Sequence, residues 1–242
     1  MEKDRSNVIV DIGNSRIKVA IFQGEHLQNK WTVESISEIS SLALSHSASW
    51  IVSSVRKNQA EINDFLEDRN YLFLTHQTPL PISLDYKTPE TLGVDRIAAA
   101  VAGNQLHPHG CVVIDAGTCL TIEHVDAQGV YRGGVISPGL IMRMKAMHTF
   151  TDGLPDISEN WQNIPLNEMG KSTYGCLMKG AFEGIIHELN GYIEVLKKDN
   201  PRLGVILTGG DAKYFETKLK APIFADLNLV LKGLNTILNY NK

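Results

Sequence analysis

The chain has 242 residues, of which 43% are hydrophobic and 21% are charged, a composition typical of globular proteins rather than of disordered or coiled-coil chains. Its 23 Lys and Arg residues are outnumbered by 27 Asp and Glu residues, and no run of cations stands out. Nucleic-acid binding depends on clustered cations, so this balance argues against nucleic acid as a partner.

The cysteines and the first residues of the chain indicate the cellular compartment. The three cysteines form no CxxC pair, so neither a disulfide framework nor a zinc site is expected, and a reducing compartment fits. The charged start leads into only a short apolar run, which does not predict a signal peptide. No stretch approaches the roughly 18 apolar residues that span a bilayer. We therefore expect a cytoplasmic protein without a membrane partner.

The hydrophobic pattern predicts alternating strands and helices along the chain. The strands are expected at 7–12, 17–22, 27–33, 50–55, 71–75, 111–115, 120–125, 130–137 and 203–208. The helices are expected at 35–45, 59–69, 94–106, from about 140, and at 173–198, 212–219 and 229–240. The segments 77–92 and 152–170 are expected to be mostly loop. The segment 107–110 is the best candidate boundary, which predicts a two-lobed α/β protein with domains 1–108 and 109–242.

One sequence pattern occurs twice. VIVDIGNSRIKV, from Val8, returns as VVIDAGTCLTIE, from Val112. In each, an apolar strand delivers an aspartate, and a glycine then allows backbone N–H groups to approach phosphate oxygens. One such turn alone is most often a plain β-hairpin. Two copies in matching strand context favour binding of a nucleotide polyphosphate and its metal ion.

This pair resembles the two phosphate motifs of the actin-like ATPase fold, a ribonuclease H-like fold shared with sugar kinases and Hsp70. The resemblance implies duplicated α/β domains. Thr208-Gly209-Gly210, after a buried strand, resembles the adenosine motif of that fold and implies adenine near Gly209 and Gly210. Taken alone, this last motif is equally consistent with a glycine turn that ends a strand.

A second set of motifs is narrower. Residues 86–96 read YKTPETLGVDR, and 133–139 read GGVISPG, with Ser172-Thr173 ahead of a long expected helix. This ordered set resembles the signature of the type III pantothenate kinases. The resemblance extends over residues 7–210 and implies ATP-dependent phosphorylation of pantothenate to 4'-phosphopantothenate, the first step of coenzyme A biosynthesis.

The residue chemistry suits a kinase that acts on an alcohol, which requires a base near the hydroxyl group and cations around the phosphates. Asp95 is the candidate catalytic base, and Arg96 beside it can bind a substrate carboxylate through two hydrogen bonds. A structural salt bridge is the alternative for this pair, and the flanking signature with Gly93 favours function.

The resemblance also implies roles for single residues. ATP phosphates would be bound by Asp11, Ile12, Gly13, Asn14, Ser15, Arg16, Ile17 and Lys18, with Asp11 on the Mg²⁺ side, and ATP would also contact Thr118. Pantothenate would be bound by Tyr86, Gly93, Val94, Asp95, Arg96 and Thr173. Asp115 would hold a monovalent cation, K⁺ or NH₄⁺, and a homodimer is implied. The sequence departs slightly from the family at Ser15, where Thr is frequent, and at Cys119, where Ala is common.

Two other functions remain open from the sequence. One is a non-catalytic accessory role in transcription within the same family, since this fold also carries non-kinases. The retained Asp11, Asp95 and Asp115 favour an enzyme. The other is a kinase for a different small hydroxy acid, against which only the substrate-side signature argues.

Overall fold

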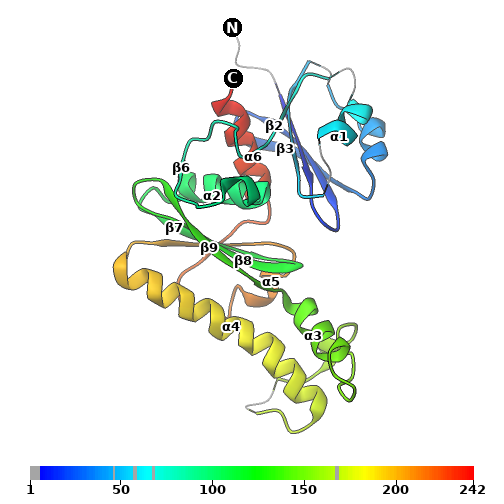
Figure 1. Ribbon diagram of the computed structural model, residues 1–242, viewed down its shortest axis with the longest axis vertical. Helices are drawn as coiled ribbons and strands as arrows, with labels where there is room; N and C mark the ends of the chain where they lie inside the picture. Colours follow the sequence, from blue (N-terminus) through cyan, green and yellow to red (C-terminus); the bar gives the residue numbers. More distant parts are fainter. Residues whose placement is uncertain (1–5, 46, 57–58, 67–68, 167–168) are drawn as a thin grey trace. The chain divides into compact units, whose positions relative to one another are not determined.

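The computed structural model describes residues 6–242 except 46, 57–58, 67–68 and 167–168. The chain forms two compact units, each with its own β-sheet and helices (Figure 1). Unit 1 comprises Met1–Leu106, Gly129–Arg132 and Asn228–Lys242, and unit 2 comprises His107–Gln128 and Gly133–Leu227. Compared with the predicted division at residue 108, two segments that were expected in the second domain belong to unit 1.

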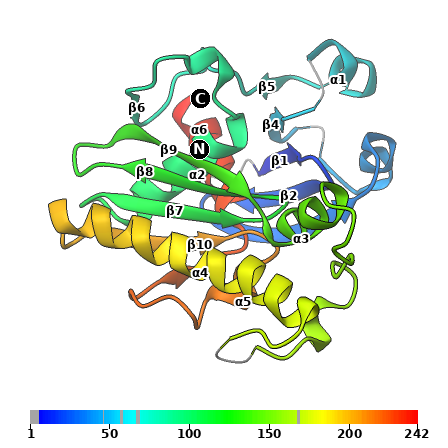
Figure 2. The ribbon, with the colours of Figure 1, turned by 60° about the horizontal axis from the view of Figure 1, so that its bottom comes forward.

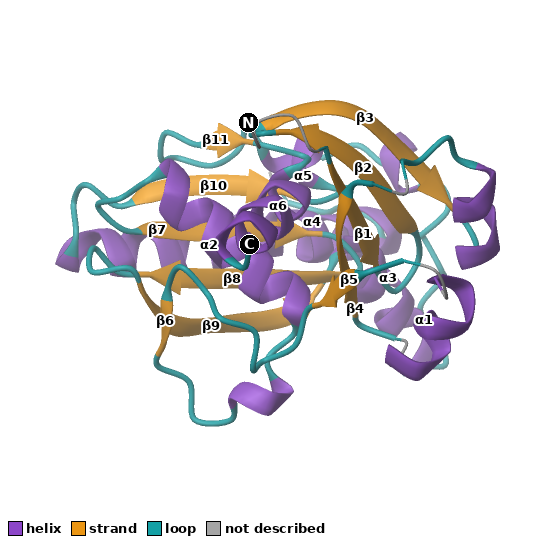
Figure 3. Ribbon diagram, turned by 90° about the horizontal axis from the view of Figure 1, so that it is seen from above, coloured by secondary structure: helices purple, strands orange, loops and turns teal. Residues whose placement is uncertain are grey.

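Unit 1 contains a five-stranded sheet in the order β3-β2-β1-β4-β5 (Figure 3). Its strands are β1 (Asn7–Ile12), β2 (Ile17–Gln23), β3 (His26–Val33), β4 (Ser49–Ser54) and β5 (Tyr71–Phe73). The central strand β1 is antiparallel to β2 and parallel to β4, and all six of its residues are buried. A strand covered on both faces needs a continuous apolar run, which explains the sequence NVIVDI.

Helices cover both faces of this sheet. Alternate residues of β1 (Val8, Val10 and Ile12) share a core with apolar residues of the 3₁₀ helix η1 (Ile36–Ser41) and of α1 (Gln59–Leu66). The other face contacts α2 (Val94–Leu106) and α6 (Leu229–Tyr240), which lie side by side (Figures 1 and 3). The sequence predicted both of these helices with the bounds that the structure has, and the alanine-rich sequence of α2 suits a helix that is buried over eight consecutive residues, 96–103.

A polar network joins α6 to the start of β1. The buried Asn7 side chain donates to Asn235 Oδ1 at 2.6 Å and to Asn239 Oδ1 at 2.8 Å, and accepts from Lys242 Nζ at 2.7 Å. Asn235 also donates to the carbonyl oxygen of Gly24 at 2.9 Å. Because buried amides that lose their partners are costly, this network selects one position of α6 on the sheet.

Unit 2 contains strands in the order β11-β10-β7-β8-β9. They are β7 (Cys111–Ala116), β8 (Cys119–Val125), β9 (Val130–Pro138), β10 (Gly204–Thr208) and β11 (Phe224–Ala225). The helices are α3 (Leu140–Thr149), the long α4 (Thr173–Asp199) and the short α5 (Ala212–Phe215), with η3 (Trp161–Asn163) between α3 and α4. Figure 2 shows α4 lying along β7 and β10, where its apolar residues join a core with alternate residues of both strands.

The first residues of β9 belong to unit 1. Val130 and Tyr131 pair in parallel with β6 (Ser83–Leu84), and the Asp85 backbone N–H donates to the Tyr131 carbonyl oxygen at 3.0 Å. β6 and η2 (Pro89–Thr91) are the only regular elements that the structure places between 77 and 92, which agrees with the expected loop. This pairing brings a residue from the middle of the sequence next to the segment 83–96.

The helix expected over residues 35–45 is wrong. Only a 3₁₀ helix of six residues forms, Ile36–Ser41, and the next residue, Leu42, is extended. Serine side chains compete for backbone partners here: Ser41 Oγ donates to the Glu38 carbonyl oxygen at 2.6 Å. The short strands β6 and β11 were not predicted, because two residues give no detectable alternation. Among the described residues, no helix is long and apolar enough to cross a membrane.

Candidate functional site

In each unit the same strand arrangement places an aspartate near the end of a central strand. In unit 1, Asp11 on β1 lies opposite Lys18 of the antiparallel strand and Ser53 of the parallel strand. In unit 2, Asp115 on β7 lies opposite Thr121 and Thr208 in the same way. The sequence repeat therefore corresponds to a structural repeat, and each aspartate has a hydroxyl-bearing residue on the neighbouring parallel strand.

The turn after β1 exposes the small polar residues of the first motif. The Gly13 N–H donates to the Arg16 carbonyl oxygen at 3.1 Å, and Asn14, Ser15 and Arg16 are exposed. Ile12 and Ile17, on either side, are fully buried in the core of unit 1. Only their backbone groups are therefore positioned to bind a phosphate, whereas the turn itself offers both backbone and side-chain donors.

Asp11 is a buried carboxylate with a specific hydrogen-bond partner. It is 7% exposed, and Ser53 Oγ donates to Asp11 Oδ1 at 2.9 Å. Burial raises the pKa of the Asp11 carboxyl, Lys18 and the Ser53 hydrogen bond act in the opposite direction, and nearby Asp95 adds to the rise. Strong desolvation with a specific charge partner is typical of functional carboxylates.

This pKa shift gives a testable dependence of stability on pH. The carboxyl has a higher pKa folded than unfolded, so its contribution to stability is present below about pH 3.8, the ordinary value, and is lost as pH rises through the raised value. We expect Asp11→Asn to increase the free energy of unfolding at neutral pH in metal-free buffer. The gain should disappear below about pH 3.8, as measured by urea unfolding across pH. A gain independent of pH would contradict this assignment.

Asp95 lies in the first turn of α2, and the helix start holds its carboxylate. Its Oδ1 accepts from the Arg96 N–H at 2.9 Å. A Cβ on Gly93 would lie 2.6 Å from that same oxygen, so only glycine leaves space for the carboxylate in this orientation. The Ile97 N–H donates to the Gly93 carbonyl oxygen at 3.1 Å, which fixes the residue before the helix. Val94, the first residue of the helix, is half-buried.

Arg96 and Tyr86, two predicted substrate residues, meet at a third side chain. Arg96 is buried, and its guanidinium donates to the Tyr131 hydroxyl oxygen at 3.1 Å. The rings of Tyr86 and Tyr131 lie 5.9 Å apart, centre to centre, with a tilt of 55°. In unit 1, Asp95 lies close enough to Asp11 to raise its pKa. Asp95 is connected to Tyr86 through Arg96 and then Tyr131.

The second turn, in unit 2, contains Gly117 and lies close to Gly139. The Gly117 N–H donates to the Cys119 carbonyl oxygen at 3.0 Å, and Thr118 is exposed. The Gly139 N–H donates to the Thr118 carbonyl oxygen at 3.2 Å, and a Cβ on Gly139 would lie 2.1 Å from the Gly117 carbonyl oxygen. This close approach explains the last glycine of the GGVISPG segment.

Arg143 of α3 holds the segment before Gly139. Its guanidinium donates to the Pro138 carbonyl oxygen at 2.8 Å and to Ser137 Oγ at 2.7 Å, and it pairs with Glu188 of α4. Together with the bond from the Gly139 N–H to Thr118, these contacts hold the three consecutive residues Ser137, Pro138 and Gly139 beside the second turn.

Gly209 and Gly210 follow β10 in unit 2. Gly209 has a φ of +97°, and a Cβ there would lie 2.2 Å from the Ala116 carbonyl oxygen and 2.4 Å from Asp115 Oδ1. Gly210 is exposed and has open space around its Cα. The glycine pair thus lies against the Asp115 strand end, which brings two of the predicted nucleotide motifs together within this unit.

Thr173 is the exposed first residue of α4, directly after the helix N-cap Ser172. The Ser172 hydroxyl accepts from the Gly175 N–H at 3.1 Å, which explains why the helix begins here. The role of Thr173 in binding substrate stays a prediction.

The donor set bears on which metal ions fit. The described residues contain no group of three or more His, Cys, Asp or Glu that could hold an ion. Mg²⁺ in kinases is bound by one or two carboxylates together with substrate phosphates and water, so the single carboxylate of Asp11 suits it. The single carboxylate of Asp115 suits a cation whose other ligands come from a bound nucleotide and water.

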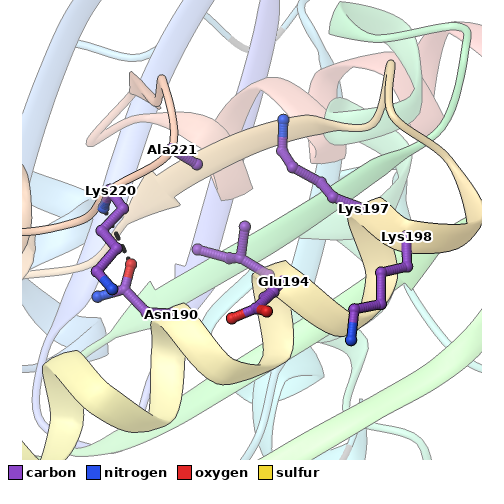
Figure 4. A pocket seen from close by; sticks show the side chains of 7 residues that line it. Asn190, Glu194, Lys197, Lys198, Lys220 and Ala221 are labelled. Carbon is purple, nitrogen blue, oxygen red and sulfur yellow. Dashed lines mark hydrogen bonds between the residues drawn. The ribbon is translucent and has the colours of Figure 1, made fainter.

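A separate cavity of about 530 Å³ lies beside the C-terminal half of α4 in unit 2 (Figure 4). Its lining is Asn190, Ile193, Glu194, Lys197, Lys198, Lys220 and Ala221. None of the predicted site residues is among them. In Figure 4 the lysine side chains point in different directions rather than converging on one point.

Three residues of the site were not predicted from the sequence: Ser53, Tyr131 and Arg143. Ser53 ends an apolar strand, so its position beside the end of β1 was a usable signal once the two strands were paired. Tyr131 carries no local signal, because its partners lie at distant positions in the sequence, and the partner of Arg143 on α4, Glu188, is equally distant.

Comparisons with known sequences show the family of the chain. The model of a protein family, the type III pantothenate kinases, matches residues 7–195. A type III pantothenate kinase of Phocaeicola vulgatus is 46% identical over 241 residues, covering 97% of this chain and 98% of the relative. The corresponding protein of Cytophaga hutchinsonii is 41% identical, with coverage of 97% and 99%.

Solved structures show the same fold. A protein of Campylobacter jejuni assigned to the Baf family of transcriptional activators matches with a TM-score of 0.66 at 24% identity, covering 97% of this chain and 98% of that one. A Sinorhizobium meliloti protein assigned as a 2-dehydro-3-deoxygalactonokinase matches with a TM-score of 0.58 at 13% identity, with coverage of 97% and 96%. These likenesses confirm the predicted actin-like ATPase fold. The chain belongs to the type III pantothenate kinase family.

Proposed function

We propose that this protein transfers the γ-phosphate of ATP to pantothenate and forms 4'-phosphopantothenate, the first step of coenzyme A biosynthesis. One observation carries the proposal beyond family membership. Asp95 and Arg96, a base and a carboxylate-binding cation, are both fixed at the start of α2, the first by Gly93 and the Arg96 N–H and the second by Tyr131.

Each residue then has a chemical task. The Asp95 carboxylate accepts the proton of the pantothenate hydroxyl, whose oxygen attacks the γ-phosphorus as the bond to ADP breaks. Arg96 binds the pantothenate carboxylate through two parallel hydrogen bonds. Tyr86, Gly93, Val94 and Thr173 complete our proposed pantothenate-binding set, which rests on the family resemblance.

The nucleotide is assigned to the two turns and the glycine pair. Backbone N–H groups of the Asp11–Lys18 segment bind phosphate oxygens, Thr118 contacts ATP, and Gly209 and Gly210 approach adenine. Asp11 would bind on the Mg²⁺ side, and Asp115 would hold K⁺ or NH₄⁺. When bound, these cations offset the negative charge of the phosphates.

We further propose that the protein is cytoplasmic and forms a homodimer. The second copy is implied by the family resemblance. Tyr192 and Val195, three positions apart on α4, are exposed large apolar side chains that we propose it covers. Sedimentation equilibrium measures the mass in solution, and a single species at 26.7 kDa would contradict the dimer.

The activity is tested by ADP release in the presence of Mg²⁺ and ATP. We expect release that depends on pantothenate and that falls when K⁺ and NH₄⁺ are replaced by a bulky organic cation. A folded protein that releases no ADP with pantothenate under either cation would contradict the kinase and favour a non-catalytic regulator. Release with another small hydroxy acid and not with pantothenate would instead change the substrate.

A further inference from the structure

Tyr131 is the buried side chain where two elements of unit 1 meet the segment 129–132. It is among the largest fully buried side chains, with 0% exposure. The pairing of Val130 and Tyr131 with β6 holds its backbone, together with the Asp85 N–H, which donates to the Tyr131 carbonyl oxygen. An exposed ion pair of 2.8 Å between Arg132 and Asp85 lies next to it. These contacts with the segment 83–85 fix the backbone of Tyr131, and the backbone in turn fixes where its side chain begins.

The two ends of Tyr131 contact two different residues of the pantothenate-binding set. Its hydroxyl accepts from the buried Arg96 guanidinium at 3.1 Å. Its ring packs at a tilt against Tyr86, 5.9 Å between centres, in the range of favourable aromatic pairs. A guanidinium carries its donors in a rigid plane, so fixing one nitrogen of Arg96 restricts where the remaining donors point.

We propose that Tyr131 is a positioning residue for the substrate carboxylate. It orients Arg96 through its hydroxyl, and it holds Tyr86 through its ring. This inference rests on the proposed function, because it assigns Arg96 to the carboxylate of pantothenate. Tyr131 itself is too deeply buried to touch the substrate and acts through its two neighbours.

The competing explanation is that Tyr131 only packs in the core. Substitution by phenylalanine distinguishes this packing role from the positioning role. Phe fills the volume of the ring and keeps the contact with Tyr86, so a packing role predicts no change in substrate recognition. Tyr131→Phe removes only the hydroxyl that accepts from Arg96. Tyr71→Phe is the matched control in the same unit, because its hydroxyl is also hydrogen-bonded to a side chain, here as the donor to Asn63 Oδ1.

The test compares pantothenate with pantothenyl alcohol, in which a hydroxymethyl group replaces the carboxylate. For Tyr131→Phe we expect KM for pantothenate to rise about 10- to 100-fold, the range for a lost hydrogen bond to a charged group. KM for ATP and kcat should stay at wild-type values. With pantothenyl alcohol, wild type and Tyr131→Phe should have the same KM, because no carboxylate is present for Arg96 to bind.

Calorimetric titration of pantothenate into wild type, Tyr131→Phe and Tyr71→Phe repeats the comparison without turnover. Weaker binding in Tyr131→Phe alone supports the inference even if ADP release is absent, in which case only the proposed reaction fails. Equal losses with both substrates, or an unchanged affinity for pantothenate, would overturn the role of Tyr131. Wild type that neither binds nor phosphorylates pantothenate overturns both proposals.

Discussion

Asp95→Asn should lower kcat for pantothenate phosphorylation by about 10²- to 10⁴-fold, the usual contribution of a positioned general base. The carboxamide has the shape of the carboxylate, and its oxygen can still accept from the Arg96 N–H. It cannot take up the hydroxyl proton. Because the change keeps the local hydrogen bond at the start of α2, the loss should appear in kcat while KM for both substrates stays within a few-fold.

The measurement is ADP release at saturating pantothenate and ATP, with circular dichroism to establish that the variant is folded. Asp64→Asn serves as the matched control, since it removes the charge of an exposed aspartate in the same unit. A folded Asp95→Asn variant with wild-type kcat would remove Asp95 from the chemistry and leave it a structural role beside Arg96.

Gly209→Ala is expected to have the largest effect on unit 2. A residue with a Cβ at a φ of +97° is strained by about 1–3 kcal/mol. The added Cβ would also lie 2.2 Å from the Ala116 carbonyl oxygen, and overpacking of this kind typically costs about 1–3 kcal/mol more. The free energy of unfolding should therefore fall markedly, and the displaced end of β7 should carry Asp115 away from its position.

Gly210→Ala is the stability control, because a Cβ there meets open space. Urea unfolding of the two variants should show a much lower midpoint for Gly209→Ala and a wild-type midpoint for Gly210→Ala. Equal midpoints for Gly209→Ala and wild type would mean that the strand end can move aside without cost. The close approach of Gly209 to the Ala116 carbonyl oxygen would then not contribute to the free energy of unfolding.

The parts of the fold that were predictable from sequence are those with a local cause. The apolar run of β1 and the alanine-rich sequence of α2 identified these elements, because burial on both faces and high helix propensity are visible within one short segment. In the serine-rich segment 35–45 the same reasoning predicted a helix that the structure does not have. There the apolar spacing suits an α-helix over the whole segment, while side-chain hydrogen bonds such as that of Ser41 favour a short 3₁₀ helix.

The candidate site divides in the same way. Asp11, Asp95 and Asp115 stand in short motifs whose glycines and strand ends are visible in the sequence. Tyr131 does not stand in such a motif. Its role depends on Tyr86 and Arg96, which only the pairing with β6 brings close to it. A tyrosine in a strand has no signal of its own that distinguishes a positioning hydroxyl from ordinary core packing.

The location of α6 has a consequence for the order in which the protein folds during synthesis. Unit 1 is built mostly from the earliest residues, yet its central strand β1 packs against α6, and Asn7 is bonded to Asn235. A ribosome delivers residues 228–242 after all of unit 2 has been made. Unit 2 can therefore assemble first, while on one face of the unit 1 sheet only α2 is in place and the area that α6 will cover, including part of β1, is still exposed. Such an exposed apolar face is where chaperones bind and where aggregation starts, so unit 1 is the more vulnerable half of the nascent chain.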